Sequence, residues 1–179
     1  MKGILKICMI VALLLADGLP VFAAPQVDLD EGTFFEAEDY DKLLHGDGFA
    51  EKTAEQLASN GQVLTGMFKP GAVSYRLTVP ADGDYVVWLR CAVPADTQLK
   101  LGVNAADDEK LLSLPVARTT EDLEAANAYQ WQRLAQIHLK QGENVLVLGQ
   151  GAQRPDCFFL ARRPDFDLSP RPRPLGPRP

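Results

Sequence analysis

VSYRLTVPADGDYVVWLRCAV, residues 73–93, carries the clearest structural signal in the sequence. From Val73 to Val79, apolar and polar residues alternate, which is the period of a β-strand with one buried face. The turn sequence Pro80-Ala81-Asp82-Gly83 follows, and from Tyr85 to Leu89 the chain is apolar on both phases. This pattern predicts a hairpin whose second strand is central and covered on both faces, with Arg90 interrupting one face.

Similar patterns extend over most of the chain. Further strands are expected at 33–40, 62–68, 99–103, 130–139, 144–149 and 157–161, with a tight connection at 141–144. About eight or nine short strands at this spacing predict an all-β fold, a jelly-roll β-sandwich. Thr119, with Asp122 three residues later, resembles a capping box, so one short helical insertion or turn is expected at about 120–127 in a long loop.

The two ends of the chain differ from the body. Lys2 and Lys6 accompany an apolar run from Ile4 to Ala16, and Val21-Phe22-Ala23 supplies a cleavage site, so residues 1–23 are predicted to be a signal peptide. Residues 24–168 are predicted to form the β-sandwich. Residues 169–179 are rich in proline and arginine and are expected to form a disordered, solvated tail rather than a recognition motif. The expected product is secreted, either extracellular or periplasmic, with no membrane insertion after cleavage.

The net charge of the chain excludes some classes of binding partner. The whole chain has a net charge of −6, and residues 24–161 alone carry −10 because both ends are net positive. An acidic body repels phosphate, so no nucleic-acid partner is expected. Neutral sugars and cations remain compatible with this charge.

Cys91 and Cys157 remain after removal of the signal peptide. In an oxidising compartment they can form a disulfide. Two small buried thiols are an equal alternative, because the sequence does not show whether the two residues lie within bridging distance.

The sequence lacks the motifs of several common catalytic sites. It has only two histidines, His45 and His138, and the latter lies between Ile137 and Leu139 as a strand residue would. It contains no nucleophile elbow, phosphate-binding loop, dinucleotide motif or zinc spacing. A glycosidase needs only two carboxylates, but no pair stands out. We therefore expect a protein that is not an enzyme.

Two carboxylates share one face of the first expected strand. In FFEAEDY, residues 34–40, Glu36 and Glu38 point to the same side because strand side chains alternate. Like charges at this distance repel unless a cation neutralises them. Calcium prefers such oxygen ligands, although a solvated edge strand explains the pattern equally well.

Several of these segments together resemble a known family. FEAEDY, GDYVVWLR, YQWQRLAQIHLKQGENVLVL and DCFFLARRPDF occur in the order and spacing of the galactose-binding-like β-sandwich modules related to carbohydrate-binding module families 6 and 35. The resemblance covers about residues 33–166. It implies a structural calcium between the first and last strands, at Glu36, Glu38 and Asp156. The chain departs from the family pattern at Arg154-Pro155, where a nearby cation would weaken or replace the metal.

The same resemblance implies a sugar site with aromatic side chains. The matching positions here are Tyr129 and Trp131, which follow the expected helical insertion. Stacking on a sugar requires an exposed ring. Tyr129, nearer the loop, is expected to be the more exposed, whereas Trp131 and Trp88 fit a core as well.

Two functions follow from the sequence. The first is a secreted, non-catalytic protein that binds a polysaccharide or other glycan and contains structural calcium. The alternative is an envelope adhesion or assembly protein that uses the same sandwich to contact a protein partner. Exposed aromatic rings along a groove would favour the first, and a flat apolar patch would favour the second.

Overall fold

The computed structural model describes residues 32–47, 49–66, 69–105, 111–149, 151 and 154–169. These residues form strands and turns, and none of them forms a helix. None of the described segments is a helix long and apolar enough to cross a membrane. The strands are β1 (Gly32–Glu36), β2 (Lys42–His45), β3 (Glu51–Ala54), β4 (Gln62–Thr65), β5 (Ala72–Val79), β6 (Gly83–Cys91), β7 (Thr97–Val103), β8 (Leu112–Val116), β9 (Gln130–Leu139), β10 (Gly142–Gly149) and β11 (Pro155–Ala161).

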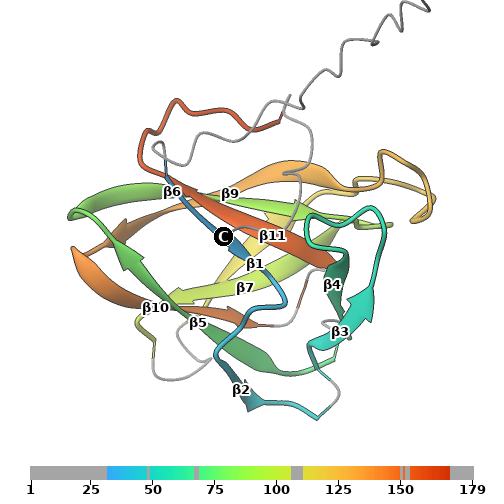
Figure 1. Ribbon diagram of the computed structural model, residues 1–179, viewed down its shortest axis with the longest axis horizontal. Helices are drawn as coiled ribbons and strands as arrows, with labels where there is room; N and C mark the ends of the chain where they lie inside the picture. Colours follow the sequence, from blue (N-terminus) through green and yellow to red (C-terminus); the bar gives the residue numbers. More distant parts are fainter. Residues whose placement is uncertain are drawn as a thin grey trace, which may run out of the picture.

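The strands form two facing sheets and a separate hairpin (Figure 1). One sheet has the order β1-β11-β6-β9, and the other has the order β2-β5-β10-β7-β8. All pairings are antiparallel, and β1, the first strand, pairs with β11, the last. The β3–β4 hairpin forms a small sheet of its own. The jelly-roll β-sandwich prediction is confirmed.

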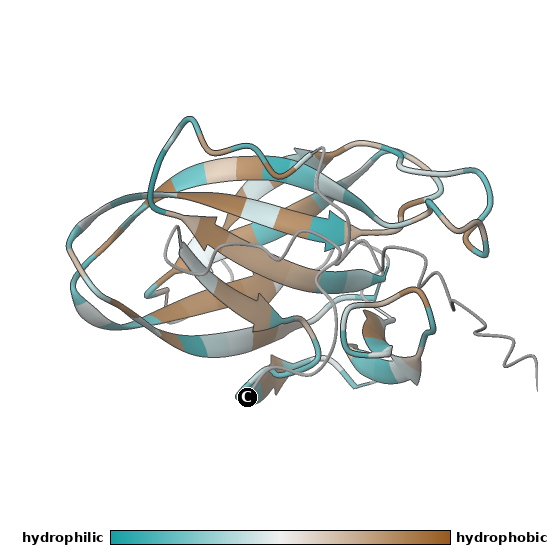
Figure 2. Cartoon of the chain, turned by 45° about the horizontal axis from the view of Figure 1, so that its top comes forward, coloured by the Kyte–Doolittle hydropathy of each residue, from teal (hydrophilic) through white to brown (hydrophobic). Residues whose placement is uncertain are grey.

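The main core lies between the two sheets. Hydrophobic residues concentrate on their strands (Figure 2). Alternate residues of β6, such as Val87, Leu89 and Cys91, face this core and meet Leu146 and Leu148 from β10. Burying side chains of this size contributes roughly 1.5–3 kcal/mol each.

The outer face of the four-stranded sheet is also covered. Over one part of it, Phe166 and Leu168 from the segment after β11 pack on Trp88, Trp131 and Phe159. Over the other part, the β3–β4 connection and the turns before β9 bring Leu57 and Ala58, together with Leu123, onto Ala92 and Tyr129. This double coverage explains why β6 is apolar on both phases.

The expected helical insertion consists of turns. Asp122 N–H bonds to Thr120 Oγ1 at 3.0 Å, and Glu124 N–H bonds to Asp122 Oδ1 at 3.0 Å. Such short-range side-chain bonds compete with the bonds of a helix. The capping pattern therefore marks the chain reversal correctly, but no helix follows it.

Cys91 and Cys157 are both buried and free. They lie on adjacent strands but on opposite faces of the sheet: Cys91 faces the core between the sheets, and Cys157 faces the outer cluster. The structure therefore corresponds to the alternative of two buried thiols. The predicted signal peptide lies outside the described residues, and so does the predicted tail beyond Ser169.

Candidate functional site

A row of side chains crosses the outer face of the four-stranded sheet. The strand register places Glu36 of β1 opposite Cys157 of β11, Cys157 opposite Arg90 of β6, and Arg90 opposite Trp131 of β9. Residues paired across neighbouring strands point to the same side of a sheet. The row therefore combines a carboxylate, a thiol and a guanidinium on one buried surface.

Asp156 joins this row through an irregularity in the strand. The pairing of β11 with β6 shifts between Pro155 and Cys157, and the Asp156 side chain reaches Arg90, with which it forms a buried salt bridge. Asp156 is completely buried, and Arg90 is 6% exposed. Arg90 also donates to the carbonyl oxygen of Leu57 at 3.3 Å from both Nη1 and Nη2. One guanidinium thus connects β6, β11 and the β3–β4 connection.

The β3–β4 connection supplies further donors to the carboxylates. Ser59 N–H donates to Asp156 Oδ1 at 2.7 Å, and the Ser59 hydroxyl contacts both Asp156 Oδ1, at 2.9 Å, and Glu36 Oε2. Asn60 Nδ2 donates to Glu38 Oε1 at 3.3 Å. The connection therefore closes over the predicted metal ligands.

Glu38 has an unsatisfied oxygen. Its side chain is 1% exposed, and its Oε2 atom has no hydrogen-bond partner among the described residues. Burial raises the pKa of Glu38, and the neighbouring charges of Asp39 and Asp156 add to this effect. An unpaired buried carboxylate oxygen is costly, since it loses water without replacement.

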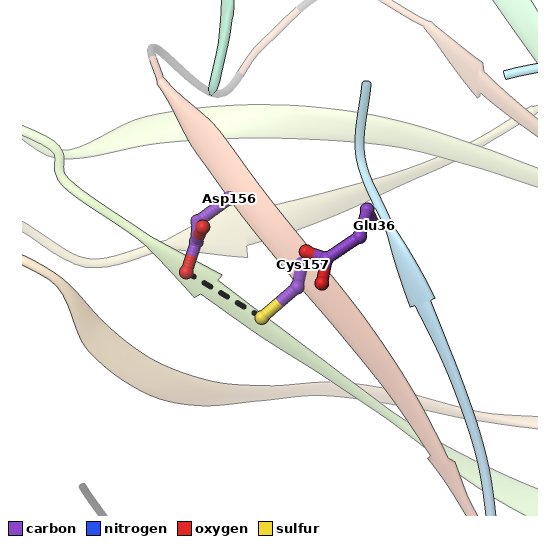
Figure 3. A group of neighbouring side chains, drawn as sticks. All are labelled: Glu36, Asp156 and Cys157. Atoms are coloured by element: carbon purple, nitrogen blue, oxygen red, sulfur yellow. Dashed lines mark hydrogen bonds between the residues drawn. The ribbon is translucent and has the colours of Figure 1, made fainter. Parts of the chain in front are cut away.

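The charges of these residues fit a divalent cation. Glu36, Glu38 and Asp156, if ionised, carry three negative charges, and Arg90 balances one of them. A calcium ion would balance the other two, and it prefers carboxylate oxygens such as the free oxygen of Glu38. Glu36, Asp156 and Cys157 also have ligand atoms that all lie within 4.8 Å of one another, so this buried group could hold an ion (Figure 3).

Arg154 does not lie where the sequence suggested. It was expected to weaken or replace the metal, but its guanidinium contacts Glu55 Oε2 at 3.3 Å and Glu124 Oε1 at 3.6 Å. The cation that contacts Asp156 is Arg90, which the sequence showed only as a break in an apolar strand.

A polar pocket of about 470 Å³ lies beside the buried network. Its lining comes from the β3–β4 hairpin, the turns before β9 and the residue that precedes β11: Thr53, Ala54, Glu55, Gln56, Leu57, Val63, Glu124 and Arg154. Glu55 accepts from Leu57 N–H at 3.1 Å and pairs with Arg154, so the charged wall of the pocket is held in place. The sequence did not indicate these residues, because the pocket combines three segments that are far apart along the chain.

The two predicted aromatic residues are buried. Tyr129 and Trp131 are each 6% exposed, so the expectation of an exposed Tyr129 ring is wrong. Arg90 stacks on the Tyr129 ring at 5.2 Å from its centroid, and Trp131 packs in the outer cluster. The Tyr129 pKa is raised by burial and responds to the charges of Glu55 and Arg154, which line the pocket. Tyr129 therefore lies next to the pocket without offering a free face to a sugar.

Comparisons by sequence find no match among protein-family models or curated proteins. Comparison of structures does find matches. A family 35 carbohydrate binding module from Clostridium thermocellum matches with a TM-score of 0.58 and 19% identity, over 72% of this chain and 98% of the other. CBM35 from Paenibacillus barcinonensis matches with a TM-score of 0.55 and 18% identity, over 74% and 100%.

Similar domains occur inside enzymes. The exo-beta-1,3-galactanase of Phanerochaete chrysosporium, solved with galactose, matches with a TM-score of 0.58 and 18% identity over 72% of this chain but only 29% of the enzyme. The two carbohydrate-binding modules described above are, by contrast, matched over nearly their whole length. The chain therefore has the fold of family 35 carbohydrate-binding modules, the galactose-binding-like β-sandwich that the sequence motifs indicated.

Proposed function

We propose that this protein is an exported, non-catalytic glycan-binding protein whose sugar site is the polar pocket between the β3–β4 hairpin, Glu124 and Arg154. The observation that carries the proposal is this pocket, because it combines a restrained ion pair with exposed polar side chains in the fold of a carbohydrate-binding module. Sugar sites need a few well-placed polar groups to orient hydroxyls.

The composition of the pocket predicts modest affinity. None of its lining residues is aromatic, so the stacking that strengthens many sugar sites is missing from this lining. Association costs offset much of what hydrogen bonds to hydroxyls contribute. We expect dissociation constants on the order of micromolar to millimolar.

A glycan array with the mature protein tests this proposal. The array should include galactose and β-1,3-linked galactose oligomers, the sugars named with the matched galactanase. For a glycan that binds, Arg154→Ala should weaken binding about tenfold or more, because it removes one partner of the restrained pair. Arg76→Ala is the matched control, since Arg76 forms an exposed pair with Glu143 on the other sheet and should bind like wild type.

The contrary result would favour the second function. If no glycan binds, or if Arg154→Ala and Arg76→Ala behave alike, the polar pocket is not the site. The alternative is then protein contact through the five-stranded sheet. Its edge strands carry the exposed leucines Leu43 and Leu44 on β2 and Leu112 on β8.

Calcium is the second part of the proposal. The ion would be held by Glu36, Glu38 and Asp156, and binding only to the folded state raises stability by about 2.7 kcal/mol at a hundredfold excess over Kd. Millimolar calcium should therefore raise the melting temperature of the wild type above its value in chelator, by several degrees. Magnesium at the same concentration is the control, because it demands a more regular coordination.

Glu38→Gln tests the ligand set directly. The amide carries no charge, so in chelator this variant should be at least as stable as wild type, whose raised Glu38 pKa means that the ionised form opposes folding at neutral pH. Calcium should no longer shift its melting temperature. A wild-type melting temperature that is unchanged between chelator and calcium would remove the metal from the proposal.

A further inference from the structure

Cys157 contributes a thiol to the buried ion cluster. The strand register places it beside Glu36, and its Sγ atom lies 3.5 Å from Asp156 Oδ2 (Figure 3). All three residues are buried, and their ligand atoms lie within 4.8 Å of one another. Calcium uses oxygen ligands, so this thiol has no role in the calcium proposal.

The sulfur–oxygen distance suits a smaller ion. In a tetrahedral zinc site, Zn–S and Zn–O bonds of about 2.3 and 2.0–2.2 Å place sulfur and oxygen about 3.5–3.7 Å apart. The Cys157 thiol donates a hydrogen bond to Asp156 Oδ2 with a sulfur–oxygen distance of 3.5 Å, so a metal bound to both atoms would replace the thiol proton with little change in this distance. Thiolates favour zinc, cadmium and cobalt over calcium.

Glu38, which is not one of these three residues, is an unsatisfied buried carboxyl group near the cluster. Its Oε2 atom is buried without a hydrogen-bond partner among the described residues, and its carboxyl group lies close enough to Asp156 for the two charges to interact. The net charge of the cluster also favours a cation. Glu36, Asp156 and a Cys157 thiolate carry three negative charges and Arg90 one positive charge, so a divalent ion balances these four groups, and an ionised Glu38 would add one further negative charge.

We infer that Cys157 makes this cluster a site for a thiophilic divalent cation such as Zn²⁺, bound by Glu36, Asp156 and Cys157. Binding forms a metal–sulfur bond and releases the thiol proton to solvent, with no change of oxidation state. The site shares Glu36 and Asp156 with the proposed calcium ligands, so the two ions compete. The inference does not depend on glycan binding.

Cobalt is the probe for the test. The mature protein is unfolded under reducing conditions, freed of reductant and refolded with Co²⁺, because the cluster is buried. A cobalt–thiolate bond gives a charge-transfer absorption in the near ultraviolet, and oxygen ligands alone do not. Wild type should show this absorption, and added Zn²⁺ should remove it.

The two cysteines offer a matched pair of variants. Cys157→Ser should abolish the absorption, whereas Cys91→Ser should retain it because Cys91 faces the opposite side of the sheet. Glu36→Gln keeps the thiol and should weaken Co²⁺ binding about tenfold or more, which tests the site even if Cys157→Ser does not fold. No absorption in wild type, its persistence in Cys157→Ser or its loss only in Cys91→Ser would overturn the inference.

The result is independent of the proposed function. Glycan binding is measured on the same refolded protein in chelator, so failure of the metal site and failure of the sugar site give separate readings. Melting temperature in calcium separates the two ions: calcium should stabilise Cys157→Ser as it does wild type, whereas Zn²⁺ should stabilise wild type only.

Discussion

Arg90 connects three segments of the protein from the middle of an apolar strand. It pairs with the buried Asp156, donates twice to Leu57 O and stacks on Tyr129. A buried pair of this kind adds little net stability compared with well-packed apolar residues, but breaking one half of it is costly. The Arg90–Asp156 pair is therefore important because it fixes the relative positions of β6, β11 and the β3–β4 connection.

Removing Arg90 should leave Asp156 buried without its counter-charge. Arg90→Met should lower the free energy of unfolding by about 3–5 kcal/mol, measured by denaturant titration at neutral pH. The double variant Arg90→Met with Asp156→Asn should recover part of that loss, because the buried charge is gone. Arg76→Ala, which breaks an exposed pair with Glu143, should cost less than about 1 kcal/mol. Equal costs for the two arginines would contradict the buried pairing.

The β3–β4 hairpin is attached to the sandwich through β4 and through its connection. β3 is exposed along its whole length, and β4 buries Val63 and Leu64. Ser59, by contrast, binds the carboxylates of β1 and β11. The hairpin forms one wall of the polar pocket, so the shape of the pocket depends on this attachment.

Ser59→Ala should loosen the hairpin while the sandwich stays intact. It removes the hydroxyl bonds to Glu36 and Asp156, and hydrogen bonds to charged groups contribute about 1.5–3 kcal/mol. Deuterium uptake should increase at residues 51–65 and remain unchanged in β5 and β10. Thr65→Ala is the control within the same hairpin, because its hydroxyl bond to Thr53 is exposed and should matter less. Uniform uptake changes across both sheets would contradict this attachment.

The strands that were predicted from sequence are those with a buried face. β5 exposes only Arg76 and Thr78, and β6 buries every residue from Tyr85 to Cys91. This burial explains the apolar patterns of both strands in the sequence. β2 and β3 are exposed throughout and have no such pattern, and β8 contains Pro115 on an edge strand. These three strands are specified by their neighbours in space, which local periodicity cannot show.

The candidate site was predictable to a similar extent. The E-x-E motif was predicted to lie on one strand, but β1 ends at Glu36, and Glu38 lies in the turn that follows. The pairing of β1 with β11 brings Glu36 next to Asp156, and Glu38 is close enough to Asp156 for their charges to interact. The contributions of Arg90 and Ser59 depend on the β3–β4 connection reaching strands that are remote in sequence. The turns at 119–129 bury Tyr129, which the loop position alone did not indicate.

At the scale of the whole molecule, both thiols are shielded from solvent. Burial raises the pKa of Cys91 to about 12, and burial together with Asp156 and Glu36 raises the pKa of Cys157 well above its usual value. A native protein produced without residues 1–23 should therefore fail to react with a thiol reagent at neutral pH, and both cysteines should react after unfolding. Reductant should leave the melting temperature unchanged, because the thiols are free. Rapid labelling of the native state would contradict this burial.

The pairing of β1 with β11 has a consequence for the order of events during synthesis. Gly32 lies opposite Ala161, so β1 has no partner until residue 161 has left the ribosome. Contacts between such distant residues form slowly. A nascent chain that lacks β11 also lacks Asp156, and so Arg90 has no counter-ion and the β3–β4 connection has no anchor there. The emergence of β11 therefore completes the sheet and the charge cluster in the same step, and a chain that ends before β11 lacks both.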